Sequence, residues 1–201
     1  VLLPGIGIGS VGEVGSVLLF GNRDPAHMRD IALPTDSATS RMLLMWLFDQ
    51  MGLNPRPVDM GPNLDEMLER CDGALLIGDR AIDEAIRNPE LIRMDLGQSW
   101  YDHTGLPMVF GVFAAHVDAP KEVLEKAHNC LLNQLDRFEN DQEYRNQLIH
   151  STSLRSGFDV ERVEQYFKEV VLSLDVKAKQ GLEKFLQEVC GTEKYEILKV
   201  D

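Results

Sequence analysis

The chain has 201 residues, the size of one large domain or two small lobes. Apolar residues make up 44% and charged residues 26%, which are the values of a globular protein and exclude a disordered or fibrous one. With 33 acidic and 20 basic residues the net charge is −13, so we expect no binding to nucleic acid and none to an anionic membrane surface.

The basic residues change in kind along the chain. Residues 1–118 contain eight arginines, seventeen acidic residues and no lysine, and the first lysine is Lys121. This shift predicts a change of organisation near residue 118. The absence of lysine also excludes Schiff-base chemistry from the first part of the chain.

The cysteines and the first residues indicate the compartment. Cys71, Cys130 and Cys190 lie far apart and form no C-x-x-C pair, so neither a zinc site nor a disulfide framework is predicted. Unpaired cysteines are typical of the cytoplasm. The opening VLLPGIGIGS lacks the basic residues of a signal peptide and is interrupted by Pro4. We therefore predict a cytoplasmic protein, and the initial Val1 predicts that the true start lies upstream.

Short apolar runs alternate with helical patterns as far as residue 120. The predicted strands are Val14–Phe20, Asp30–Leu33, Gly73–Ile77 and Pro107–Phe113, and the predicted helices are Ser37–Met51, Asn63–Arg70 and Asp95–Thr104. Strands separated by helices predict an α/β fold with a parallel or mixed sheet covered on both faces. After Pro120 the strand signals stop, and helical spacing predicts Lys121–Phe138, Asp141–His150, Val160–Leu174 and Lys177–Val189.

Gly7, Gly9 and Gly12 have the spacing of the dinucleotide fingerprint G-x-G-x-x-G. That motif follows a strand and opens a helix, whereas here Pro4 precedes it and the strand-like VGSVLLF follows it. We therefore expect no nicotinamide site and interpret the segment as a flexible approach to a hinge or pocket. The five histidines have no metal-ligand spacing, and no P-loop or nucleophile elbow occurs, so the sequence predicts neither a cofactor nor a metal.

Hydroxyl side chains gather at the start of the apolar helix Ser37–Met51; they are Thr35, Ser37, Thr39 and Ser40. Hydroxyls and free backbone N–H groups at a helix N-terminus form an anion site that the helix dipole assists. A single such residue serves as an ordinary helix cap. Because four hydroxyls exceed what one cap needs, we predict that Ser37, Thr39 and Ser40 bind an anionic ligand.

Gly78 and Asp79 follow the predicted strand Gly73–Ile77. Ligands of open α/β sheets lie beyond the carboxyl ends of the strands. At that place Asp79 either orients a hydroxyl of the ligand or caps the next turn, and both alternatives stay open. Gly78 and Asp79 are therefore candidate substrate-binding residues.

Four segments, LLPGIGIGSVGEVGSVLLF, IALPTDSATSRMLL, GALLIGDRAI and WYDHTGLPMVFGVFAA, occur in the order seen in the menaquinone-biosynthesis chorismate dehydratases of the futalosine route. The chain resembles this family over residues 2–116. The resemblance implies a type II periplasmic-binding-protein-like fold, with two α/β lobes, mixed sheets, a helical C-terminal segment and a ligand cleft. The expected lobes are 1–20 with 107–201, and 21–106, joined by crossover strands at Val14–Phe20 and Met108–Phe113.

Members of that family carry several strands and helices before the segment that matches LLPGIGIGS. We therefore expect the chain to lack part of the first lobe and to expose sheet edges and apolar surface there. We also expect little activity from the chain by itself, because one wall of the cleft is missing.

The resemblance further implies that the substrate is the small anion chorismate, which is dehydrated to 3-[(1-carboxyvinyl)oxy]benzoate. No redox cofactor is implied, because formation of the aromatic ring drives the reaction. Ser16 matches the family serine in V-x-S-V and is the catalytic candidate, with Asp79 expected at the opposite wall of the cleft.

Two alternatives remain open. One is the sister enzyme 1,4-dihydroxy-6-naphthoate synthase, whose histidine base has no match here, and the other is a non-catalytic protein that captures an anionic solute.

Overall fold

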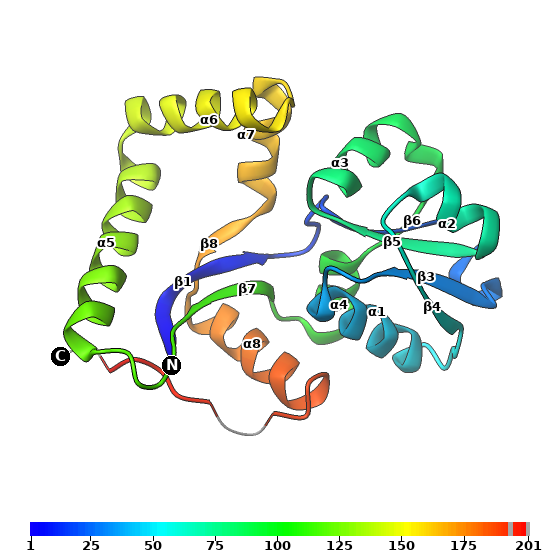
Figure 1. Ribbon diagram of the computed structural model, residues 1–201, viewed down its shortest axis with the longest axis horizontal. Coiled ribbons are helices and arrows are strands. Elements are labelled where there is room, and N and C mark those ends of the chain that lie inside the picture. Colours follow the sequence, from blue (N-terminus) through cyan, green and yellow to red (C-terminus); the bar gives the residue numbers. More distant parts are fainter. Residues whose placement is uncertain (193–194, 200–201) are drawn as a thin grey trace. The chain divides into compact units, whose positions relative to one another are not determined.

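The computed structural model describes residues 1–192 and 195–199, which form two compact α/β units (Figure 1). Residues 1–10 and the chain from residue 107 onward form the first unit, and residues 11–106 form the second. No helix in the described part of the chain is long and apolar enough to cross a membrane.

The second unit is built on a five-stranded mixed sheet with the strand order β4-β3-β5-β2-β6. Its strands are β2 (Val17–Gly21), β3 (Asp30–Pro34), β4 (Arg56–Met60), β5 (Gly73–Ile77) and β6 (Ile92–Asp95). Strand β3 is parallel to β4 and β5, whereas β2 is antiparallel to both of its neighbours, β5 and β6. All residues of β2 are buried, as expected for an apolar strand in the middle of a covered sheet.

Four helices accompany this sheet, namely α1 (Ala38–Gln50), α2 (Leu64–Arg70), α3 (Gly78–Arg87) and α4 (Leu96–Thr104). Short 3₁₀ turns lie at Pro25–His27 and Pro89–Leu91. The side chains of Ser37, Asn63 and Asp95 cap α1, α2 and α4 by accepting backbone N–H groups, which is why these helices begin where the sequence places Ser, Asn and Asp. Phe20, Phe48 and Trp100 are fully buried in this unit.

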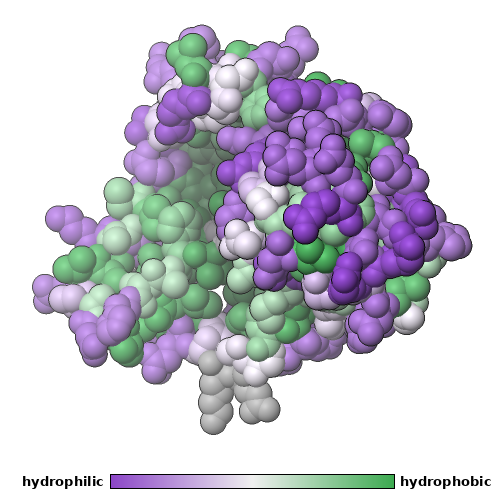
Figure 2. Space-filling view, turned by 45° about the vertical axis from the view of Figure 1, so that its right-hand side comes forward, coloured by the Kyte–Doolittle hydropathy of each residue, from purple (hydrophilic) through white to green (hydrophobic). Residues whose placement is uncertain are grey.

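The first unit contains a three-stranded antiparallel sheet with the order β7-β1-β8. Its strands are β1 (Leu2–Ser10), β7 (Met108–Ala114) and β8 (Val171–Ser173), and its helices are α5 (Lys121–Asn140), α6 (Gln142–Ser156), α7 (Val160–Glu169) and α8 (Val176–Glu188). Val112, Phe113 and Ala114 on the edge strand β7 are exposed. Figure 2 shows much hydrophobic surface on the visible face of this unit, whereas hydrophilic residues cover most of the visible face of the second.

The structure confirms the predicted α/β class and corrects the interpretation of Gly7–Gly12. Residues 2–10 are strand β1, not a flexible approach. A Cβ atom on Gly7 would lie 2.7 Å from the Gly111 carbonyl oxygen, and one on Gly9 would lie 2.7 Å from that of Met108. These glycines therefore permit the close approach of two strands.

The predicted helix Val160–Leu174 is also wrong in its last part. Helix α7 ends at Glu169, and Val171–Ser173 is strand β8, which pairs with β1. The expectation that strands stop after Pro120 is therefore corrected. Strands β4 and β6 and helix α3 were not predicted from the sequence.

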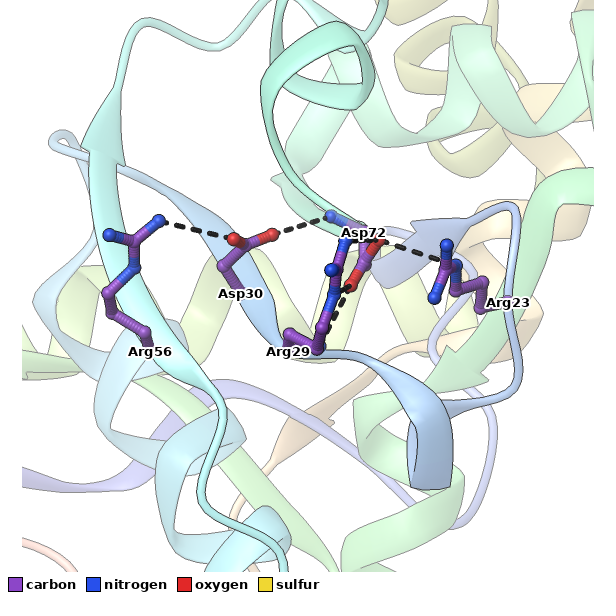
Figure 3. Close-up of polar contacts among 5 residues, drawn as sticks. All are labelled: Arg23, Arg29, Asp30, Arg56 and Asp72. Atoms are coloured by element: carbon purple, nitrogen blue, oxygen red, sulfur yellow. Dashed lines mark hydrogen bonds and ion pairs between the residues drawn. The ribbon is translucent and has the colours of Figure 1, made fainter.

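An ionic network joins the amino ends of β3 and β5 in the second unit (Figure 3). The Asp72 carboxylate accepts hydrogen bonds from the Arg29 backbone N–H at 2.9 Å and from Arg29 Nε at 3.0 Å, and Arg23 Nε lies 3.4 Å away. Asp30 accepts from the Asp72 backbone N–H at 3.0 Å and from Arg56 at 3.2 Å. The side-chain hydrogen bond from Arg29, followed by its backbone hydrogen bond, lowers the pKa of Asp72 below the ordinary value of 3.8.

Replacing Asp72 by Asn is expected to lower the free energy of unfolding at pH 7 by up to about 1 kcal/mol, the scale of ion pairs that remain open to solvent. Because the pKa of Asp72 is lowered in the folded state, its contribution is present above the unfolded-state value and is lost as pH falls through the folded pKa. Urea unfolding of the wild type and Asp72→Asn from pH 7 down to pH 3 should show the two converging below about pH 4. Asp49→Asn, at an exposed carboxylate, is the control. A difference that does not narrow between pH 5 and pH 3 contradicts the assignment.

Candidate functional site

All six candidate site residues lie in the second unit, at one edge of its sheet. Strands β3 and β5 are parallel, so the segments that follow them leave the sheet at the same edge. Ser37, Thr39 and Ser40 follow β3, and Gly78 and Asp79 follow β5. Strand β2 is antiparallel to β5 and pairs Val17 with Ile77, so Ser16 enters the sheet where β5 ends. We call these six residues the candidate site.

Ser16 and Gly78 are directly connected. The Gly78 backbone N–H donates to the Ser16 carbonyl oxygen at 2.7 Å. Gly78 has a φ of +61°, a left-handed conformation that favours glycine at the first position of α3. The residue Ser16 is 5% exposed, and no hydrogen bond to its hydroxyl is found in the described part of the chain. The hydroxyl oxygen is not sealed from solvent, so this group is available to a ligand.

The hydroxyls at the start of α1 divide into two kinds. The Ser37 hydroxyl accepts the Ser40 backbone N–H at 3.3 Å and donates to the Ser40 hydroxyl at 3.0 Å. Ser37 therefore caps the helix, and the Ser40 hydroxyl is bonded to the cap. The Thr39 hydroxyl is half-buried and has no hydrogen-bond partner among residues 1–192 and 195–199, so it is the surplus hydroxyl of this helix end.

Asp79 does not cap helix α3. The residue before this helix is Ile77, and no side chain hydrogen-bonds the first turn within the described residues. The Asp79 carboxylate is exposed in that turn, where the helix dipole favours a negative charge. Its neighbour Arg80 forms an ion pair of 2.7 Å with Asp36, which lies just before α1. This pair, not anticipated from the sequence, links the starts of α1 and α3.

Asp95 is the residue of this edge that sequence reasoning missed. Its carboxylate caps α4 through the Gln98 N–H at 3.0 Å. The same carboxylate accepts the backbone N–H of Val14 at 3.0 Å and that of Gly15 at 2.8 Å. The sequence predicts a helix that begins at Asp95 but carries no signal that the carboxylate holds a segment some 80 residues earlier.

The structure shows no metal-binding arrangement in the residues it describes. No group of three or more His, Cys, Asp or Glu side chains there could hold an ion. Cys71, Cys130 and Cys190 are unpaired, and burial raises the pKa of the Cys71 thiol. None of the three cysteines belongs to the candidate site.

Comparison with known proteins decides the family. Residues 1–190 match a family model described as menaquinone biosynthesis. The chain belongs to this family. It is 37% identical over 134 residues to a chorismate dehydratase from Thermus thermophilus, a match that covers 59% of this chain and 49% of the relative. The chain therefore spans about half the length of this curated relative.

Solved structures show the same fold. The protein AF1704 from Archaeoglobus fulgidus superposes with a TM-score of 0.64 at 19% identity, over 94% of this chain and 72% of that one. An ABC transporter protein from Parabacteroides distasonis gives a TM-score of 0.52 at 16% identity, over 94% and 68% of the respective chains. The predicted α/β class with a mixed sheet and helices is thus confirmed, and the chain shares the fold of these two proteins. At these identities the likeness concerns the fold alone.

The hydrogen bonds at this edge predict that replacing Ser37 by Ala lowers stability, whereas replacing Ser16 by Ala does not. Ser37→Ala removes the cap of α1 and should lower the free energy of unfolding by about 1 kcal/mol. Ser16→Ala removes a hydroxyl without a partner and should leave stability unchanged or slightly higher. Thermal and urea unfolding of the two variants measures the difference. A loss for Ser16→Ala as large as that for Ser37→Ala would show that the Ser16 hydroxyl is bonded within the protein.

Proposed function

We propose that the chain is part of a cytoplasmic enzyme that dehydrates chorismate to 3-[(1-carboxyvinyl)oxy]benzoate in the futalosine route of menaquinone biosynthesis. Membership of the menaquinone biosynthesis family and the identity to a chorismate dehydratase support the proposal. The structural observation that carries it is the Ser16 hydroxyl, which has no partner in the described residues and belongs to a residue bonded to the start of α3.

The site offers donors for an anionic substrate. Helices α1 and α3 both begin at this edge, and the first N–H groups of a helix favour a carboxylate. The Thr39 hydroxyl adds a side-chain donor at the start of α1, while Ser37 and Ser40 hold the helix end in place. Because the whole chain carries a net charge of −13, long-range attraction cannot recruit chorismate, and the binding must come from these short-range donors.

The reaction removes a proton and the ring hydroxyl of chorismate as one molecule of water, and the ring becomes aromatic. No electron is gained or lost overall. In this proposal Ser16 donates its hydroxyl proton to a hydrogen bond with the substrate. Gly78 holds the Ser16 backbone through their 2.7 Å hydrogen bond. The exposed Asp79 carboxylate accepts a hydrogen bond from the hydroxyl of the substrate and so orients it.

The test is the conversion of chorismate by the protein translated from the complete reading frame that contains this sequence. We expect proton NMR to show loss of the ring signals of chorismate and growth of aromatic signals. Ser16→Ala should lower kcat/KM tenfold or more, about 1.4 kcal/mol of transition-state stabilisation. Binding of chorismate without turnover would favour the solute-binding alternative and contradict the proposal. Turnover of a different futalosine-route intermediate would favour the sister enzyme.

A further inference from the structure

One side chain, that of Asp95, binds the backbone of the segment that carries Ser16. Residues 11–16 lie between strands β1 and β2 and contain two glycines in the left-handed region, Gly12 with φ +86° and Gly15 with φ +64°. Such a segment has no regular hydrogen-bonding pattern of its own and needs external partners to adopt one conformation. The Asp95 carboxylate supplies them by accepting two consecutive N–H groups, those of Val14 and Gly15.

The two oxygens of Asp95 have different partners. Oδ1 accepts the Gln98 N–H at 3.0 Å, which begins α4, and the Val14 N–H at 3.2 Å. Oδ2 accepts the Gly15 N–H at 2.8 Å and the Val14 N–H at 3.0 Å. One carboxylate therefore satisfies three backbone donors from two segments of the second unit. Only an ionised carboxylate offers acceptors in all these directions.

The neighbourhood leaves this segment little freedom to find another arrangement. Val14 is 2% exposed, so its side chain anchors the middle of the segment in the core. A Cβ atom on Gly12 would lie 2.8 Å from the side-chain oxygen of Gln98, so the segment also runs close against the first turn of α4. Directly after Gly15, the Ser16 carbonyl accepts the Gly78 N–H. The position of the Ser16 hydroxyl therefore depends on the bonds that precede it by one and two residues.

We propose that Asp95 is a positioning residue for Ser16, and that its carboxylate fixes the segment Val14–Gly15 so that the Ser16 hydroxyl is directed at the substrate. This inference rests on the proposed function and adds a residue to it. Asp95 itself does not touch the substrate in this scheme. Its effect on catalysis passes through Ser16, since small displacements of a catalytic group can lower the rate by up to about 100-fold.

The decisive variant is Asp95→Asn, which keeps the size and shape of the side chain. Asn caps helices as well as Asp does, so the amide oxygen can still accept the Gln98 N–H. The amide NH₂ then faces the Gly15 N–H. Because both groups are donors, the hydrogen bond between residue 95 and Gly15 is lost. Asp141→Asn is the matched control. Asp141 caps α6 by accepting the Tyr144 N–H, and its side chain has no second hydrogen bond within the described residues.

We expect Asp95→Asn to lower kcat/KM for chorismate by tenfold or more through kcat, and Asp141→Asn to leave it within about twofold. In the double variant Ser16→Ala/Asp95→Asn, kcat/KM should equal that of Ser16→Ala within about twofold, because two residues that act through one contact are not additive. A merely structural role of Asp95 would instead multiply the two losses. Multiplied losses, or an unchanged kcat/KM in Asp95→Asn, would overturn the proposal.

A second measurement does not depend on activity. Hydrogen exchange of the Gly15 amide, followed by NMR, should become at least tenfold faster in Asp95→Asn, while the amide of Phe20 in the buried strand β2 keeps its wild-type rate. If the Gly15 amide keeps its protection, Asp95 does not hold the segment and the proposal fails. If the wild type does not convert chorismate, the proposed function fails, and the exchange rates still decide whether Asp95 fixes this segment.

Discussion

The antiparallel insertion of β2 between β5 and β6 is the constraint on which the candidate site depends. Every residue of β2 is buried, so a slip of one residue in its register would exchange the two buried faces of the strand. The register pairs Val17 with Ile77 and thereby sets Ser16 beside Gly78. It also pairs Leu18 with Asp95, which brings the Asp95 carboxylate to the residues just before β2. The core of the unit therefore determines which polar groups meet at its edge.

The two edges of this sheet differ in how their polar groups are used. At the amino ends of β3 and β5, the Asp72 and Asp30 carboxylates are paired with arginines and backbone N–H groups (Figure 3). At the opposite edge, the hydroxyls of Ser16 and Thr39 are left without partners in the described residues. A polar group paired within the protein stabilises the structure, whereas an unpaired hydroxyl that solvent can reach is free to bind a ligand. The second edge also contains structural pairs, such as that of Arg80 with Asp36, so its two unpartnered hydroxyls are the reason for proposing that it binds a ligand.

Local signals were sufficient to predict several of the helix starts and some of the buried strands. Asn63 before α2 and the run Gly73–Ile77 need only neighbouring residues to be recognised, and both were placed correctly. Strand β1 was missed because its glycines resemble a loop, although they are needed for contact with Gly111 and Met108 across the sheet. Strand β8 was missed because its apolar residues continue the helical spacing of α7.

The residues of the candidate site stay a prediction, and the structure adds the hydrogen bonds that the sequence could not indicate. The rule that ligands lie beyond the ends of strands suggested Gly78, the hydroxyls at a helix start suggested Thr39, and the family resemblance suggested Ser16. Which hydroxyls cap a helix and which stay free depends on side-chain geometry that the sequence does not contain. The role of Asp95 depends on a contact between residues about 80 positions apart, which no local pattern encodes.

Backbone amide chemical shifts recorded during a titration with chorismate test most directly whether this edge of the second unit binds the substrate. The largest changes should occur at Ser16, Thr39 and Gly78, with little change at Arg29 and Asp72 at the opposite edge. Changes centred on Arg29 and Asp72, or saturable binding that leaves the amides of Ser16 and Gly78 unaffected, would contradict the assignment.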